Sequence, residues 1–330
     1  MAEFLAESLA PLPEGELFCR EDNKYYTASK KALEECLMQN RTVEAPCIVC
    51  DSRHNLIIDF GFMKGMIPRF EGALGIEEGI TRDIALISRV NKPVCFKVTG
   101  FTKDSFGRDT ALLSRRAAQH ECMQNYVSAL KKGDVIGVKV THLEQFGAFV
   151  DIGCGIPSLI PIDAISISRI SHPSDRFFIG QKIFAVIKSK ESGTTASNDG
   201  SSSGQGGKIT LSHKELLGTW AENAANFSVG ETVAGIVRSI ENYGIFVELA
   251  PNLAGLAELR DNVKINQQAS VYIKAIIPEK MKLKLIIVDI CEYNYINHTY
   301  DYFIDSGKIN KWVYSTPESE KLILSDFTAE

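Results

Sequence analysis

The fold is decided by two stretches, KKGDVIGVKVTHLEQFGAFVDIG at 131–153 and FSVGETVAGIVRSIENYGIFVELA at 227–250. They superpose at a constant offset of 97 residues, which aligns Gly133 with Gly230, Phe146 with Tyr243, Gly147 with Gly244 and Phe149 with Phe246. Four matches at one offset indicate an internal repeat, and a repeat has to be identified before any element is assigned.

The segments that follow the two stretches also correspond. IPSLIPIDA (156–164) matches LAGLAELRD (253–261), and each is followed by two further apolar runs that end in GKITLS (207–212) and MKLKLIIVD (281–289). Each unit thus holds five short runs rich in β-branched residues and bounded by turn residues. Five strands in about 70–80 residues suit a small barrel of the OB type.

A weaker third copy lies upstream, at 45–72, 92–101 and 110–119. It keeps the order of strands, with Asp59 where the next unit has Asp151, but His54 and Ile57 stand in the places of Phe146 and Phe149. The predicted fold is therefore mainly β, with three tandem five-stranded OB barrels and short flanking helices.

These units predict a division of the chain into five parts. They are an N-terminal extension (1–40) with a helix capped at Ser29, a degenerate OB domain (41–120), an OB domain (131–220) with a flexible Ser/Gly loop at 192–207, a third OB domain (226–290), and an aromatic C-terminal appendage (291–330) expected to pack on the third barrel.

Composition excludes several classes of protein. The 330 residues are 45% hydrophobic, yet no apolar run reaches the length of a membrane span, and the N-terminus is acidic where a secretory signal is basic. The eight scattered cysteines fit reduced thiols in a cytoplasm, and we expect all of them to be packing residues. The net charge of −5 is concentrated at the two ends, so the middle of the chain can hold a basic groove.

The aromatic pair Phe146 and Phe149 carries the functional signal. Residues three apart in a regular strand face opposite sides, so we expect a bulge at Gly147 to bring both rings to one face, with Asp151 also pointing outward. An exposed ring can stack an unpaired base, and nearby cations can follow a phosphate backbone. These cations are Lys139, Lys188 and Lys208. The alternative is that the rings are barrel packing and the lysines are ordinary solvated charges.

FGAFVDIG and YGIFVEL, each after a first strand with the pattern G-x-x-V-x-G/A-x-V, resemble the S-one motif, the RNA-binding domain of bacterial ribosomal small-subunit protein S-one. The resemblance covers about residues 41–290 and implies single-stranded RNA binding by two aromatics, a third-strand polar residue and a fifth-strand cation. It assigns these roles to Phe146, Phe149 and Lys208 in the second unit and to Tyr243, Phe246 and Lys282 in the third.

This sequence departs from the family pattern on the third strand, where histidine is usual. Pro68, Pro161 and Glu258 stand there in the three units, and the glutamate opposes phosphate in the third. In the first unit His54, Ile57, Pro68 and Thr110 replace all four roles. We therefore expect the first unit to dock onto a protein or the ribosome.

Other motifs are weak. The CxxC at 47–50 has no second ligand pair, so we expect two strand cysteines and no metal site, and no cofactor is implied. His172 is a minor candidate for a phosphate contact or, alternatively, for a local turn contact. The carboxylates of the long connection in the first unit are read as a solvated face: Glu71, Glu77, Glu78 and Asp83.

The sequence therefore predicts a cytoplasmic, non-enzymatic protein that binds single-stranded RNA. The resemblance adds a role in translation, with mRNA as partner and the small ribosomal subunit as a second partner through the first barrel. Two alternatives stay open, namely a protein-docking adaptor built from OB barrels and an RNA-processing factor.

Overall fold

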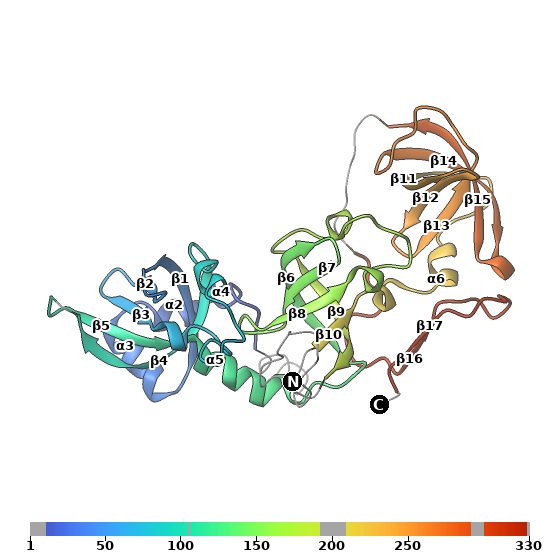
Figure 1. The fold of residues 1–330 in the computed structure, drawn as a ribbon. Coiled ribbons are helices and arrows are strands. Elements are labelled where there is room, and N and C mark those ends of the chain that lie inside the picture. Colours follow the sequence, from blue (N-terminus) through green and yellow to red (C-terminus); the bar gives the residue numbers. More distant parts are fainter. Residues whose placement is uncertain (1–10, 105, 192–208, 292–299, 329–330) are drawn as a thin grey trace. The chain divides into compact units, whose positions relative to one another are not determined.

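The computed structural model describes residues 11–104, 106–191, 209–291 and 300–328. Over these residues the chain forms three closed five-stranded barrels in succession (Figure 1). All three have the same order, in which the fifth strand lies between the third and the fourth and runs parallel to the third. This is the topology of the OB barrel, so the predicted fold class is confirmed.

The first barrel is preceded and followed by short helices. Its strands are β1 (Thr42–Cys50), β2 (Leu56–Asp59), β3 (Lys64–Ile67), β4 (Pro93–Lys103) and β5 (Asp109–Ser114). Its helices are α2 (Glu21–Tyr26), α3 (Lys30–Met38), the 3-10 turn η1 (Arg69–Glu71), α4 (Ile84–Ile87) and α5 (Arg115–Cys122), which continues as a π-helix over Met123–Val127. The Oγ atom of Ser29 accepts a hydrogen bond from the backbone N–H of Ala32 at 3.2 Å, as the predicted cap requires.

The second barrel carries the better-preserved motif. Its elements are β6 (Val135–Glu144), β7 (Gly147–Asp151), β8 (Pro157–Pro161), the 3-10 turns η3 (Ile162–Ala164) and η4 (Pro173–Asp175), β9 (Lys182–Lys190) and β10 (Ile209–Ser212). The turn η5 (Lys214–Leu217) and helix α6 (Trp220–Ala224) lead on to the third barrel. The predicted Ser/Gly loop at 192–207 lies outside the described residues.

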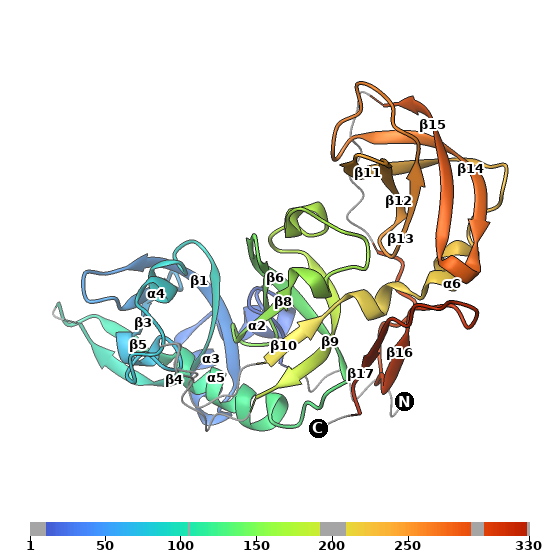
Figure 2. The same cartoon turned by 45° about the vertical axis from the view of Figure 1, so that its right-hand side comes forward.

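The third barrel follows helix α6 along the chain (Figure 2). It consists of β11 (Thr232–Glu241), β12 (Gly244–Ala250), β13 (Leu253–Ala257), β14 (Gln268–Ile277), the 3-10 turn η6 (Pro278–Lys280) and β15 (Lys282–Ile290). Along β15, Leu283, Leu285 and Ile287 are buried, while Lys282 and Lys284 are exposed. This period of two separates the core from the outer surface of the barrel.

The chain divides into two compact units. The first holds the first barrel together with residues 151–157, and the second holds the strands of the second barrel, the third barrel and the C-terminal segment. Among the described residues, no helix combines the length and the apolar character needed to cross a membrane.

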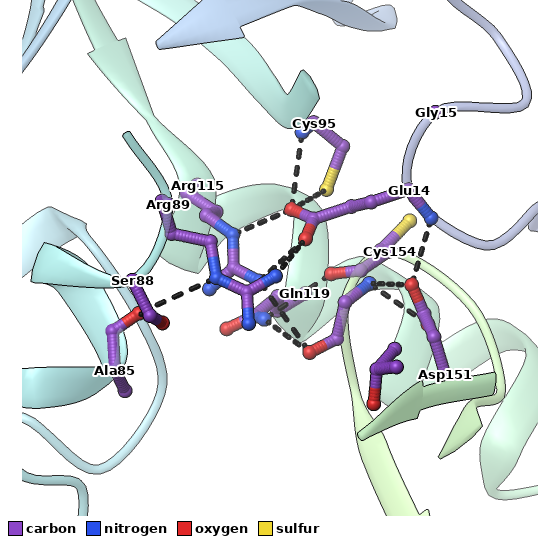
Figure 3. A network of polar contacts seen from close by, with 12 residues as sticks. Glu14, Gly15, Ala85, Ser88, Arg89, Cys95, Arg115, Gln119, Asp151 and Cys154 are labelled. Atoms are coloured by element: carbon purple, nitrogen blue, oxygen red, sulfur yellow. Dashed lines mark hydrogen bonds and ion pairs between the residues drawn. The ribbon is translucent and has the colours of Figure 1, made fainter. Parts of the chain in front are cut away.

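A buried polar network organises the first unit (Figure 3). The Glu14 carboxylate accepts hydrogen bonds from Arg115 at 2.6 Å, from Arg89 at 2.9 Å and from the backbone N–H of Cys95 at 3.2 Å. Burial works to raise the pKa of this carboxyl, but the two guanidinium groups outweigh it and the pKa is lowered. The N-terminal extension is therefore tied to the first barrel through a buried ion pair.

Asp151, which is predicted to point outward, is covered and does not reach solvent. Its side chain is 3% exposed and accepts hydrogen bonds from the backbone N–H groups of Glu14 at 2.7 Å and Gly153 at 2.8 Å. Burial raises the pKa of this carboxyl to about 6. Strand alternation correctly places the Asp151 side chain on the outer side of the barrel. The N-terminal segment around Glu14 covers it there.

The repeat places a second buried carboxylate at the same position of the third barrel. Glu248, which lies 97 residues after Asp151, is 5% exposed. It accepts hydrogen bonds from Arg176 at 2.7 Å and from Arg238 at 2.9 Å. Both carboxylates at this repeat position are thus buried and hydrogen-bonded to residues outside their own strand.

The C-terminal segment is more integrated than an appendage on the third barrel. Its strands β16 (Lys311–Val313) and β17 (Leu324–Asp326) form a small sheet, and Trp312 and Tyr314 are buried. The Tyr314 hydroxyl donates to the carbonyl of Asn252 at 2.6 Å, while the backbone N–H of Ile309 donates to the carbonyl of Gly133 at 2.8 Å. The segment therefore contacts both the second and the third repeat.

All eight cysteines are free thiols. Five are buried, and Cys47 and Cys50 lie on β1 as predicted, but Cys19 is exposed and contradicts its expected role in packing. The carboxylates of the first unit's long connection pair locally, with Asp83 to Arg69 at 2.7 Å, Glu77 to Arg116, and Glu71 accepting from Ser114.

Candidate nucleic-acid interface

The two rings of the second repeat lie together on the outer surface of the barrel. Phe146 occupies the two-residue turn between β6 and β7, and Phe149 lies within β7. Their centroids are 5.9 Å apart and their planes are perpendicular. Phe146 is 56% exposed, while Phe149 is half-buried, so the pair offers an aromatic surface that the barrel core does not use.

The third repeat reproduces this geometry. Tyr243 and Phe246 have centroids 6.1 Å apart with perpendicular planes, and Tyr243 is 70% exposed. Two ring pairs with the same geometry on equivalent strands show that the sequence repeat is also a repeat of surface structure. The described residues of the first repeat have Ile57 at the matching strand position, and this side chain is half-buried.

The bulge expected at the glycine is not the reason that the rings meet. The first ring of each pair stands in the hairpin turn before its strand begins, where strand alternation does not apply. In the third repeat the register breaks on β11, between Val237 and Ser239, and not at Gly244. The bulge expected at Gly244 is therefore wrong, although the expected placement of each ring pair on one side is correct.

The glycine has a different purpose, which is close approach of the neighbouring strand. A Cβ atom at Gly147 would lie 2.5 Å from the carbonyl oxygen of Ile160, and one at Gly244 would lie 2.6 Å from that of Ala257. Neither distance is compatible with a side chain unless the backbone moves. The glycine lets the third strand pack against the start of the second, directly beside the rings.

Three cations were predicted beside the rings of the second repeat. Lys139 is half-buried on β6, and the Lys188 ammonium lies 4.0 Å from the carboxylate of Asp163. Asp163 follows Pro161, so this cation lies near the end of the third strand, where the S-one pattern has its polar residue. Lys208 lies outside the described residues.

The third repeat brings a lysine into line with its rings. Strand pairing places Phe246 opposite Leu256, and Leu256 opposite Lys284 on the fifth strand. The predicted residue, Lys282, is exposed two positions earlier on the same face of β15. Lys284 was missed because the register that selects it is a property of the folded sheet. Glu258 follows β13 and is exposed, so its negative charge is accessible to a phosphate at this surface.

His172 makes the local turn contact that was weighed against phosphate binding. Its Nδ1 atom accepts a hydrogen bond from the backbone N–H of Ser174 at 3.1 Å and caps η4. His142 was not predicted at all. It lies on β6, is exposed, and its ring is stacked with that of Phe149 at a centroid distance of 6.4 Å and an interplanar angle of 30°.

The fold and the ring pairs define a protein of tandem OB barrels, two of which carry an exposed aromatic pair on their outer surface. Residues 129–196 match the family model "S1 RNA binding domain". The chain is 28% identical over 278 residues to "Small ribosomal subunit protein bS1" of Staphylococcus aureus (strain COL), an alignment that covers 75% of this chain and 65% of that protein. These findings confirm the resemblance to the S-one family.

The chain is also similar to a second ribosomal protein and to a solved multidomain structure. The protein of the same description from Staphylococcus haemolyticus (strain JCSC1435) is 27% identical over 298 residues, covering 78% of this chain and 70% of that one. A solved multidomain protein with nucleic acid binding domains from Streptococcus pneumoniae TIGR4 is 12% identical over 75% of this chain and 73% of that one, with a TM-score of 0.22. The chain spans about two thirds of the length of the bS1 relatives.

Proposed function

We propose that this protein binds single-stranded RNA through its second and third barrels and acts in translation in the cytoplasm, with mRNA as its ligand. The observation that carries the proposal is the repeated pair of perpendicular, solvent-facing rings, Phe146 with Phe149 and Tyr243 with Phe246. The similarity to small ribosomal subunit proteins supports the link to translation. The proposed activity is binding, without a cofactor and without catalysis.

The physical basis is stacking combined with charge. Every base has a π-face, and stacking on an aromatic side chain contributes about 1–3 kcal/mol per base. Lys139 and Lys188 in the second barrel, and Lys282 and Lys284 in the third, supply positive charge on the same barrels. A lysine that contacts phosphate releases a counterion, so the affinity falls with salt at a slope of about −0.7 per phosphate on single strands.

The three barrels differ in what they offer to RNA. The second barrel has rings and no acidic residue at the third-strand position, whereas the third has Glu258 there. The first has Ile57 and Thr110 in place of a ring and a cation. We propose that the second barrel binds most tightly, that the third is weaker, and that the first docks onto the small ribosomal subunit.

The test is a titration of the full chain with a fluorescent single-stranded oligouridylate at about 50 and 200 mM salt. Phe149→Ala is expected to weaken binding about 5- to 140-fold at either salt, with Phe246→Ala producing a smaller loss. Ile57→Ala is the matched control at the same strand position of the first barrel. Binding that ignores salt, or equal losses for Phe149→Ala and Ile57→Ala, would refute the proposal.

The lysine assignment has its own comparison. Lys284→Ala should reduce both the affinity and the salt slope of the third barrel, measured in a Phe149→Ala background where the second barrel is weakened by the loss of one stacking ring. Lys282→Ala tests the position that the sequence alone selects. If Lys282→Ala has the larger effect, the RNA backbone runs past the start of β15. The choice of Lys284 from the strand register would then be wrong.

A further inference from the structure

The first strand of the second barrel carries an aromatic nitrogen ring that no sequence pattern assigns. His142 lies on β6, and its imidazole is inclined by 30° to the ring of Phe149, with centroids 6.4 Å apart. Phe149 in turn contacts Phe146 edge to face at 5.9 Å. The three side chains therefore form one continuous aromatic surface across the β6–β7 hairpin.

One face of the imidazole is available to a ligand. Its Nε2 atom lies 2.7 Å from a carboxylate oxygen of Glu144, and the two side chains are 59% and 46% exposed. A hydrogen bond to a ring nitrogen lies in the plane of the ring, so it fixes the orientation of the imidazole and leaves the face turned away from Phe149 uncovered. Glu144 thus holds the ring in place without competing for stacking.

The repeat supplies an internal comparison. The offset of 97 maps His142 onto Ser239, and in the third barrel Ser239 is directly opposite Phe246 in the strand register. The position is therefore the cross-strand neighbour of the second ring, where side chains are in direct contact. The second barrel fills this position with a ring, and the third barrel fills it with a hydroxyl.

We propose that His142 is a base-stacking residue of the second barrel, which thereby holds one more base of a single strand than the third barrel does. This inference rests on the proposed RNA-binding function. The imidazole comes from the first strand, whereas the third-strand position of this barrel holds Pro161. The additional ring makes the second barrel the stronger RNA site by a contact that is distinct from its lysines.

The experiment uses the full chain and the same oligouridylate. His142→Ala should weaken binding about 5- to 140-fold, the range expected for loss of one stacked base. His142→Phe keeps a π-face and should stay within about 2-fold of the original affinity. Ser239→His should strengthen binding by the third barrel, measured in the Phe149→Ala background, because it supplies the missing ring.

Each outcome decides one claim. If the original chain does not bind the oligouridylate, the proposed function fails. If Phe149→Ala weakens binding but His142→Ala does not, only the role of His142 fails. Equal losses for His142→Ala and His142→Phe would show that the imidazole acts by hydrogen bonding and would also overturn it. Because His142 is exposed and Ser239 is only half-buried, unchanged melting temperatures should show that the two His142 variants and Ser239→His remain folded.

Discussion

Acidification should destabilise the second unit through one buried histidine. His213 is completely buried at the end of the second barrel. Its Nδ1 atom donates to the carbonyl oxygen of Ile165 at 3.1 Å, and its Nε2 atom accepts from the hydroxyl of Tyr302, also at 3.1 Å. Both ring nitrogens are therefore hydrogen-bonded in the neutral imidazole, and a second ring proton would require the Tyr302 hydroxyl to change from donor to acceptor in this contact.

The size of the effect follows from the pKa. Burial lowers the pKa of His213 from 6.5 to about 4, and the Arg176 charge lowers it further, while the Ile165 carbonyl opposes the shift. Between these two values the unfolded chain binds more protons than the folded one, so stability rises with pH. Acidification from pH 7 to below 4 should thus cost about 3 kcal/mol at this site, of which about 2 kcal/mol is lost by pH 5.

The assay is urea unfolding of the original chain and of His213→Asn at several pH values from 7 to 4. The variant should be less stable at pH 7, because it loses the ring contacts with Phe177 and Tyr300. The difference between the two proteins should shrink by about 3 kcal/mol as the pH falls, because only the original chain must protonate a buried imidazole. Other titrating groups are common to both proteins and cancel in the difference.

A difference that does not change with pH would refute this reasoning. If His213→Asn does not fold, the imidazole can be titrated directly by NMR in the original chain. A signal from His213 that titrates near pH 6.5 would show that the ring is solvated and that its contact with Tyr302 does not persist. A midpoint near 4 would support the buried neutral form.

The remaining predictions concern packing and the first barrel. Gly147→Ala should destabilise the chain by about 1–3 kcal/mol, because the new Cβ would lie 2.5 Å from a backbone carbonyl oxygen. The control is Gly137→Ala, whose Cβ would lie 3.9 Å from a ring atom and should be tolerated, and thermal melting compares the two variants. Glu248→Ala should cost about 3–5 kcal/mol by leaving two buried guanidinium groups without their carboxylate, and the exposed Glu258→Ala should cost little in urea unfolding. Ile57→Ala should leave RNA affinity per folded molecule unchanged, as fluorescence titration can show.

Much of the fold could be predicted because it depends on local patterns that are repeated. The alternation of apolar residues and the constant offset identify three barrels without any knowledge of contacts. The ring pairs were also predictable, because Phe146 and Tyr243 occupy equivalent places in the repeat. The sequence indicates that Gly147 is important beside the rings, but it does not reveal why. The neighbouring strand approaches this glycine closely, and such an approach cannot be read from one segment of sequence.

The rest could not be predicted, because it depends on residues far away in the sequence. Asp151 is buried by the backbone of Glu14, which lies 137 residues earlier, and Glu248 by Arg176, which lies 72 residues earlier. Lys284 is selected by a strand register that spans three strands. Its alignment with Phe246 becomes visible only when the sheet is closed.

In the second and third barrels, the outer face of the second strand combines a covered carboxylate with an open ring. Phe149 and Asp151 have the same parity on β7, as Phe246 and Glu248 have on β12, so each pair lies on the outer side of its barrel. In both cases the carboxylate end is covered and hydrogen-bonded, while the ring end stays open. The covered carboxylates fix the two strands, and fixed strands hold the rings at defined positions. For the RNA binding that we propose, this would favour affinity because less order would be lost when a base stacks on a ring.

The first barrel shows what happens on the second strand when the ring is absent. Its second strand has Ile57 where the others have a ring and Asp59 where they have the buried carboxylate. Asp59 is exposed and accepts only a local hydrogen bond from the backbone N–H of Gly61 at 2.8 Å among the contacts of the described residues. The ring and the buried carboxylate are thus lost together, as expected if the carboxylate contributes to binding by positioning the ring.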